Sequence, residues 1–132
     1  MSTNYRQTLI TVSPDCPVTV ATPPPKAGSI AGLQYALLME QPYALTSDEL
    51  LFEVYAIRSA IGPLDRDGAR TAFLSKSQAC LRASPLVKMY GWGLHHDEEC
   101  KVAAIGIETE EYRALTQRTD VRCVAGMRSK RG

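Results

Sequence analysis

The sequence lacks several signatures that would assign a protein to a functional class at once. No apolar stretch approaches the ~20 residues that a membrane-spanning helix needs. The chain contains neither a G-x-S-x-G elbow nor a glycine-rich phosphate loop, which disfavours serine hydrolases of that type and enzymes that cradle phosphates. The first residues, MSTNYRQTLI, do not combine a basic region with an apolar run, so we expect no secretory signal and a cytoplasmic location.

Cysteine is sparse, and its four copies are scattered at Cys16, Cys80, Cys100 and Cys123. Because no two of them form a C-x-x-C pair, their spacing fits neither a zinc knuckle nor a redox dithiol. We therefore expect free thiols in a reducing compartment, which agrees with the cytoplasmic location. We expect no metal and no cofactor.

Length and charge favour one ordinary globular domain. A chain of 132 residues fits a single domain and can bury roughly two thirds of its unfolded surface without a disulfide or a metal. Residues 1–64 carry three Lys or Arg against five Asp or Glu, whereas residues 65–132 carry twelve against nine. This imbalance is too small to predict a nucleic-acid partner, so weak nucleic-acid binding through the basic tail is only a minor alternative.

Residue patterning predicts an α+β fold, in which amphipathic helices cover a small, mainly antiparallel sheet. Ser29, Thr46 with Glu49, and Thr109 are helix-capping signals, and Gly91 suits the left-handed position after a helix end. The expected elements are a strand at 8–12, a proline-rich loop at 14–28, a helix between Ser29 and Pro42, a helix between Thr46 and Gly62 with its apolar stripe at Leu50, Val54, Ile57 and Ile61, a short helix after Asp65 or Asp67, a second short helix at 86–90, a hairpin of strands 92–96 and 101–108, a helix after Thr109, a strand at 121–127 and a basic tail at 128–132.

Residues 76–101, KSQACLRASPLVKMYGWGLHHDEECK, hold the only Trp, both His and two of the four Cys. Arg82 and Lys88 are cationic donors, and Trp92 between two glycines can offer an open aromatic face. With His96 beside them, these groups predict a site for a small anionic molecule. Our leading hypothesis is therefore a binding or accessory module with its site in the 80–97 region.

Two other interpretations of the same stretch stay open. A small enzyme without a cofactor would use Cys80 as nucleophile and His95 or His96 as base. A metal site is disfavoured, because in an extended strand only His95 and Asp97 share a face and two ligands are too few. The enzyme is the first alternative to the binding module.

Several segments resemble a family of small proteins known only as a domain of unknown function. The resemblance rests on DCP at 15–17, QYALL at 34–38, DELLFEVYAIR at 48–58, QACLRASPL at 78–86, YGWG at 90–93 and MRSKR at 127–131. It extends over nearly the whole chain and implies a single compact domain, with no activity to carry over. The family pattern implies a glycine beside Lys101, where this sequence has Cys100.

Overall fold

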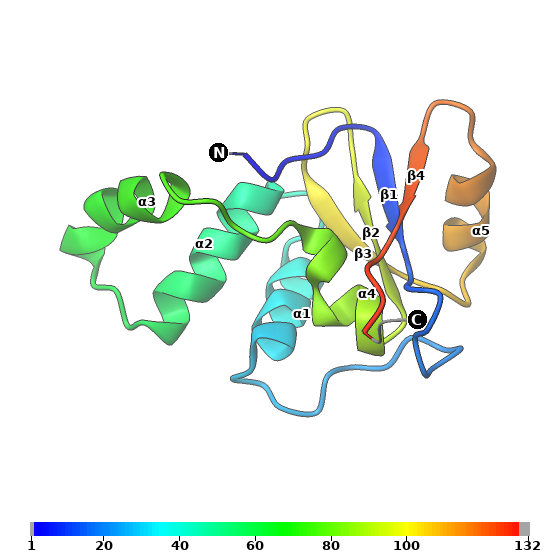
Figure 1. Cartoon of the computed structure of the whole chain (residues 1–132), viewed down its shortest axis with the longest axis horizontal. Helices are drawn as coiled ribbons and strands as arrows, with labels where there is room; N and C mark the ends of the chain where they lie inside the picture. Colours follow the sequence, from blue (N-terminus) through cyan, green and yellow to red (C-terminus); the bar gives the residue numbers. More distant parts are fainter. Residues whose placement is uncertain (1, 130–132) are drawn as a thin grey trace.

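The computed structural model describes residues 2–129, which form one α+β domain (Figure 1). The basic tail predicted at 128–132 lies partly outside these residues. The described elements are β1 (Thr8–Thr11), α1 (Ile30–Glu40), α2 (Ser47–Arg58), η1 (Pro63–Asp65), α3 (Arg66–Leu74), η2 (Leu81–Ala83), α4 (Pro85–Met89), β2 (Trp92–His96), β3 (Val102–Gly106), α5 (Glu110–Gln117) and β4 (Arg122–Ala125).

The four strands form one mixed sheet in the order β3-β2-β1-β4. β2 and β3 make the predicted antiparallel hairpin, and β1 pairs antiparallel with β2. β4 adds parallel to the other edge of β1, with Thr8 opposite Arg122. The sheet is therefore mainly antiparallel, as the sequence predicts, and the first strand lies inside it.

Alternate strand residues supply the two cores. Ile10, Leu94 and Val102 face the side covered by α1 and α4, where they pack with Leu38 and Leu86. The other face carries the second apolar cluster under α5, whose buried members are Leu9, Val12, Ala103, Ile105, Tyr112, Leu115 and Val121. β1 and β3 thus contribute side chains to both layers, as the two-residue period of a strand requires.

The predicted capping residues begin their helices. Ser29 Oγ accepts a hydrogen bond from the Gly32 amide, and Thr46 and Glu49 form both hydrogen bonds of a capping box. Thr109 Oγ1 accepts from the Tyr112 amide at the start of α5. These contacts satisfy amide groups that would otherwise lack a partner in the first turn.

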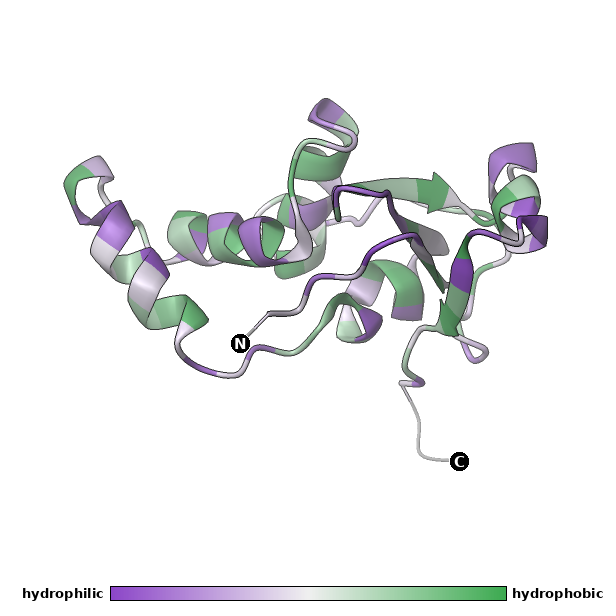
Figure 2. Ribbon diagram, turned by 90° about the horizontal axis from the view of Figure 1, so that it is seen from above, coloured by the Kyte–Doolittle hydropathy of each residue, from purple (hydrophilic) through white to green (hydrophobic). Residues whose placement is uncertain are grey.

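The α2–α3 pair lies to one side of the sheet, opposite α5 (Figures 1 and 2). Leu50 and Val54 are buried, but Ile57 is 51% exposed, so the predicted stripe of α2 turns toward solvent near its end. The reason is that the last turn of α2 has passed beyond the sheet, and the main contacts of α2 are with α1 and α3. Among the described residues, no helix has the length and apolar character needed to cross a bilayer.

Candidate functional site

The structure separates the residues that the sequence groups around Trp92. Trp92 and His96 lie at the two ends of β2, about 13 Å apart at the rise of an extended strand. His96 is completely buried, so its ring does not face a solvent-filled hollow with the others. Trp92 is half-buried, and its indole nitrogen donates to the Thr22 carbonyl at 2.9 Å. The indole therefore anchors the proline-rich loop to the start of β2 through this hydrogen bond.

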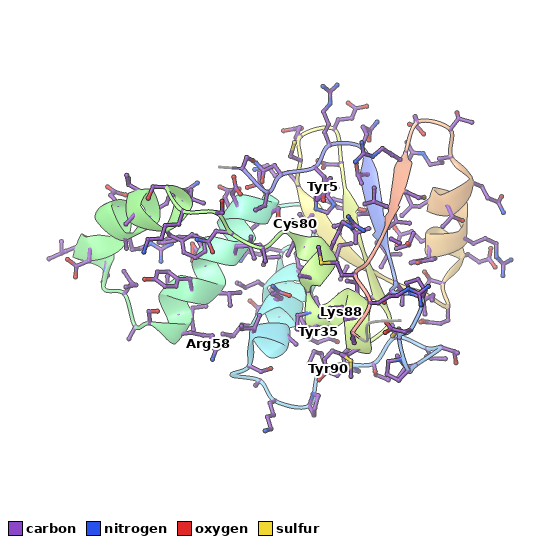
Figure 3. The ribbon with its side chains drawn as sticks, in the orientation of Figure 1. Tyr5, Tyr35, Arg58, Cys80, Lys88 and Tyr90 are labelled. Atoms are coloured by element: carbon purple, nitrogen blue, oxygen red, sulfur yellow. The ribbon has the colours of Figure 1, made fainter. Side chains whose placement is uncertain are left out.

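Arg82 and Lys88 lie on the short helical turns before β2. The Arg82 Nε donates to the Ala125 carbonyl at 2.7 Å, and the Met127 amide donates to the Arg82 carbonyl at 2.8 Å. Arg82 thus ties η2 to the end of β4. Lys88 is half-buried on α4, near Tyr35 and Tyr90 in the view of Figure 3.

The two adjacent histidines point to opposite faces of the sheet. His95 Nδ1 lies 2.8 Å from the Tyr43 hydroxyl, and His96 Nδ1 lies 3.1 Å from the Leu94 carbonyl. In the described part of the chain, neither Nε2 atom has a hydrogen-bond partner. Burial lowers the pKa of both imidazoles, that of His96 to about 4. Both rings are therefore neutral at physiological pH.

Cys80 is half-buried and contacts the N-terminal segment. The Tyr5 hydroxyl donates to Cys80 Sγ at 3.5 Å, and the Tyr5 ring packs edge-on against His96 with ring centroids 5.3 Å apart (Figure 3). Burial is the main cause that raises the pKa of Tyr5, with the thiol second, so its hydroxyl keeps its proton. The thiol thus has a tyrosine partner.

The acidic turn after β2 is built from its own side chains. Asp97 Oδ1 accepts hydrogen bonds from the Glu99 and Lys101 amides, both at 2.9 Å. Cys100 adopts φ 65° in this turn, the left-handed region that favours glycine. Within residues 2–129, no group of three or more His, Cys, Asp or Glu side chains is arranged to hold a metal ion.

A hollow with a volume of about 430 Å³ lies between α1, α2 and α3. A second hollow of about 300 Å³ adjoins it and reaches the segment before α4. Both cavities are lined by Ile30, Gln34 and Leu51, so they lie side by side, and we call the two together the α1–α2 groove. Its first cavity also contacts Tyr55, Arg58 and Phe73, and its second contacts Cys80, Leu81 and Ser84.

The walls of the groove are largely apolar and aromatic. The rings of Tyr55 and Phe73 stack with centroids 4.8 Å apart, and Phe73 also meets Phe52 edge-on. Ile30 is 43% exposed and Tyr55 is 40% exposed. Apolar side chains in a concave surface of this size are typical of small-molecule sites.

Two polar side chains stand out against these walls. Gln34 is only 2% exposed, and its Oε1 accepts a hydrogen bond of 2.6 Å from Ser84 Oγ. Arg58 ends α2 at the rim of the first cavity, and no ion pair in the described residues involves it. Figure 3 shows its side chain reaching from the end of α2 toward α1.

Comparison with known proteins gives one match. The protein-family model described as a family of unknown function (DUF6157) matches residues 1–132, the full length of the chain. Searches of the curated proteins and of the solved structures return no match.

Proposed function

The chain belongs to this family of unknown function, and we propose that it is a binding module whose α1–α2 groove takes a small, largely apolar molecule with an anionic group. The observation that carries the proposal is that two cavities lie side by side and share Ile30, Gln34 and Leu51. Each has the size of a small-ligand pocket, and an elongated ligand would extend from one to the other past the shared residues.

Exposed apolar surface supports this assignment. Ile30 and Tyr55 leave about two fifths of their surface open beside the half-buried Leu51 and Phe73. Covering such surface contributes roughly 25 cal/mol for each Å² removed from water. A ligand with an apolar body gains this free energy without any change in the backbone.

The positive charge at the rim of the groove is the reason to propose an anionic group on the ligand. Arg58 is exposed and offers a guanidinium that can bind a carboxylate through two parallel hydrogen bonds. Lys76 lines a further hollow beside the Tyr55–Phe73 pair. The cations at this end of the groove favour a ligand whose polar end is negative.

The 80–97 region contributes Cys80, Leu81 and Ser84 to the second cavity. An anion site made of Arg82, Lys88, Trp92 and His96 is the competing location. The burial of His96 and the hydrogen bonds of Arg82 and Trp92 favour the groove instead.

A thiol-dependent enzyme is the second candidate, because Cys80 lines the groove and accepts a hydrogen bond from Tyr5. Its sulfur forms no hydrogen bond to either histidine in the described residues, so no base of the Cys–His kind is in contact. The binding module therefore ranks first.

A carboxylate with a medium-length chain tests the proposal. We expect dodecanoate to bind the wild-type protein in isothermal titration calorimetry. Leu51→Glu places a carboxylate inside the groove and should abolish binding, whereas Leu64→Glu is the matched control because Leu64 is 99% exposed and lines neither cavity. Equal binding by both variants would refute the groove as the site.

A second pair of variants separates the two locations. Arg58→Ala should weaken dodecanoate binding about threefold, the size expected of an exposed charge pair. Arg82→Ala should leave the affinity unchanged. The reverse result would favour the anion site at Arg82, Lys88 and Trp92.

The proposed ligand is the only partner that the groove suggests, and nucleic acid is no part of the proposal. A cytoplasmic location is part of it. All four cysteines are free thiols, as in a reducing compartment. Fractionation of cells that express the protein, followed by detection of the chain in the soluble cytoplasmic fraction or outside it, decides that point.

A further inference from the structure

Gln34 stands at the junction of the two cavities, since it lines both of them. Its side chain is 98% buried by its neighbours and is oriented by Ser84, whose hydroxyl accepts from the Leu86 amide at 3.1 Å and donates to Gln34 Oε1. Because that hydroxyl proton goes to Oε1, the amide oxygen is engaged and the amide nitrogen is left with two hydrogens to donate.

No group in the described part of the chain accepts a hydrogen bond from that nitrogen. Among the described residues, the side-chain polar atoms that are sealed from solvent without a hydrogen-bond partner are the Nε2 atoms of the two histidines. The Gln34 nitrogen is not one of them, so solvent can reach it. It therefore opens onto the groove. A ligand that covers this nitrogen without an acceptor would leave the amide unpaired at a cost of about 1–3 kcal/mol, and an acceptor on the ligand avoids that cost.

We propose that the ligand carries a carbonyl group in the middle of its apolar body, and that the Gln34 amide nitrogen donates a hydrogen bond to it. This inference rests on the proposed function. The order of the groove residues defines the class. Arg58 lies at one end, Gln34 follows Ile30 by one turn of α1, about 6 Å along the helix axis, and Cys80 lies in the cavity beyond.

A molecule that matches this order has a carboxylate for Arg58, a carbonyl for Gln34 and an acyl chain for the second cavity. N-acyl amino acids and related acyl amides have these three parts within one short molecule. The second cavity suits the chain, because Leu51, Leu81, Ala83 and Pro85 line it. Ser84 acts as a positioning residue, since it fixes the amide without reaching the ligand through its own proton.

Two probes of equal chain length test the inference. N-decanoylglycine has the internal carbonyl, and tridecanoate replaces it with methylene groups. Wild-type protein should bind N-decanoylglycine about threefold to tenfold more tightly in calorimetry, the value of one hydrogen bond. Gln34→Leu should lose this preference, because the carbonyl of N-decanoylglycine then has no donor in the groove. Equal affinities in the wild type, or an unchanged preference in Gln34→Leu, would overturn the inference.

The experiment distinguishes failure of the proposed function from failure of the hydrogen bond to Gln34. If neither probe binds the wild type, the proposed function is wrong, whereas binding of both probes without preference contradicts only the carbonyl contact. Should Gln34→Leu fail to fold, infrared spectroscopy of the wild-type complex decides: the isotopically labelled carbonyl of N-decanoylglycine should absorb at lower frequency when bound than in an apolar solvent. An unshifted band contradicts the hydrogen bond.

Discussion

The Tyr5 hydroxyl donates a hydrogen bond to Cys80 Sγ across 3.5 Å, which joins two segments 75 positions apart in the chain. The contact fixes one side of the thiol against the N-terminal segment. Cys80 also lines the second cavity of the α1–α2 groove. The reactivity of the Cys80 thiol should therefore depend on whether a ligand occupies the groove.

Occupancy of the groove should protect Cys80 from alkylation. We expect dodecanoate to slow the reaction of Cys80 with iodoacetamide severalfold, because the ligand covers the thiol. Cys123 lies exposed on β4 and provides the internal control, so its rate should not change. Peptide mass spectrometry over a time course measures both rates. Equal slowing at the two thiols would point to an indirect effect and contradict the prediction.

Gly93→Ala should destabilise the contact between the sheet and α5. A Cβ at this position would lie 2.6 Å from Tyr112 Cε2 and 3.2 Å from the Ile10 carbonyl oxygen. Tyr112 has little room to yield, because its hydroxyl accepts a hydrogen bond from the Val12 amide at 3.0 Å. We expect a loss of about 1–3 kcal/mol in the free energy of unfolding, measured by urea denaturation.

Gly68→Ala is the matched control for that substitution. Gly68 lies inside α3, and an added Cβ meets no atom within 4 Å. This variant should gain about 0.5–1 kcal/mol of stability, since alanine favours a helix interior. Destabilisation of both variants by similar amounts would argue against the steric explanation at Gly93.

Acid should destabilise the protein through His96. Burial lowers the pKa of His96 to about 4 from the value of 6.5 in the unfolded chain, so the folded state binds a proton less readily. The stabilisation is complete above pH 6.5 and is lost as the pH falls toward 4, by up to about 3 kcal/mol. Burial shifts the pKa of His95 in the same direction.

Urea unfolding at several pH values between about 7 and about 4 measures the effect, because this range includes the unfolded and the folded pKa of His96. His96→Gln should flatten the profile in this range, and His95→Gln should flatten it less. If His96→Gln loses as much stability as the wild type between these pH values, another group causes the acid sensitivity.

Cys100→Gly should stabilise the turn between β2 and β3. Cys100 has φ 65°, where a side chain costs ~1–2 kcal/mol, and glycine removes that cost while adding ~0.5–1 kcal/mol of unfolded-state entropy. We expect a net gain of about 0.5–1 kcal/mol in thermal or urea unfolding. Cys100→Ala keeps the Cβ and removes the thiol, so it should show no such gain. A gain in both variants would assign the effect to the sulfur.

The sequence predicts the fold well because its signals are local. Ser29, Thr46 and Thr109 cap the helices as expected, and the hairpin of β2 and β3 follows the alternating apolar pattern. The glycine implied beside Lys101 also has a physical meaning, since Cys100 occupies a left-handed conformation. Local chemistry of this kind needs no knowledge of distant contacts.

The groove was missed because it is assembled from distant segments. Gln34, Leu51 and Ser84 come from three parts of the chain, and only packing brings them together. One signal was present: α2 has apolar residues on two adjacent faces, with Leu51 and Tyr55 beside the buried Leu50 and Val54. A helix with a stripe that wide has a second surface to cover, and in this chain that surface lines the groove.

Rare residue types gather in residues 80–97, and this clustering predicts a site there, yet several of these side chains make structural contacts instead. Trp92 fastens the proline-rich loop, and Arg82 fastens the end of β4. The rarity of a residue type does not predict the direction of its side chain. That direction depends on how the strands and helices pack, which involves residues far away in the sequence.

The position of β1 has a consequence for synthesis of the chain. Thr11 of β1 and Val124 of β4 lie 113 positions apart and are neighbours in the sheet. While the ribosome is still making the chain, one edge of β1 has no partner until β4 emerges. The sheet therefore closes only after β4 has left the ribosome, and until then β1, one of the two inner strands, is open to other pairings.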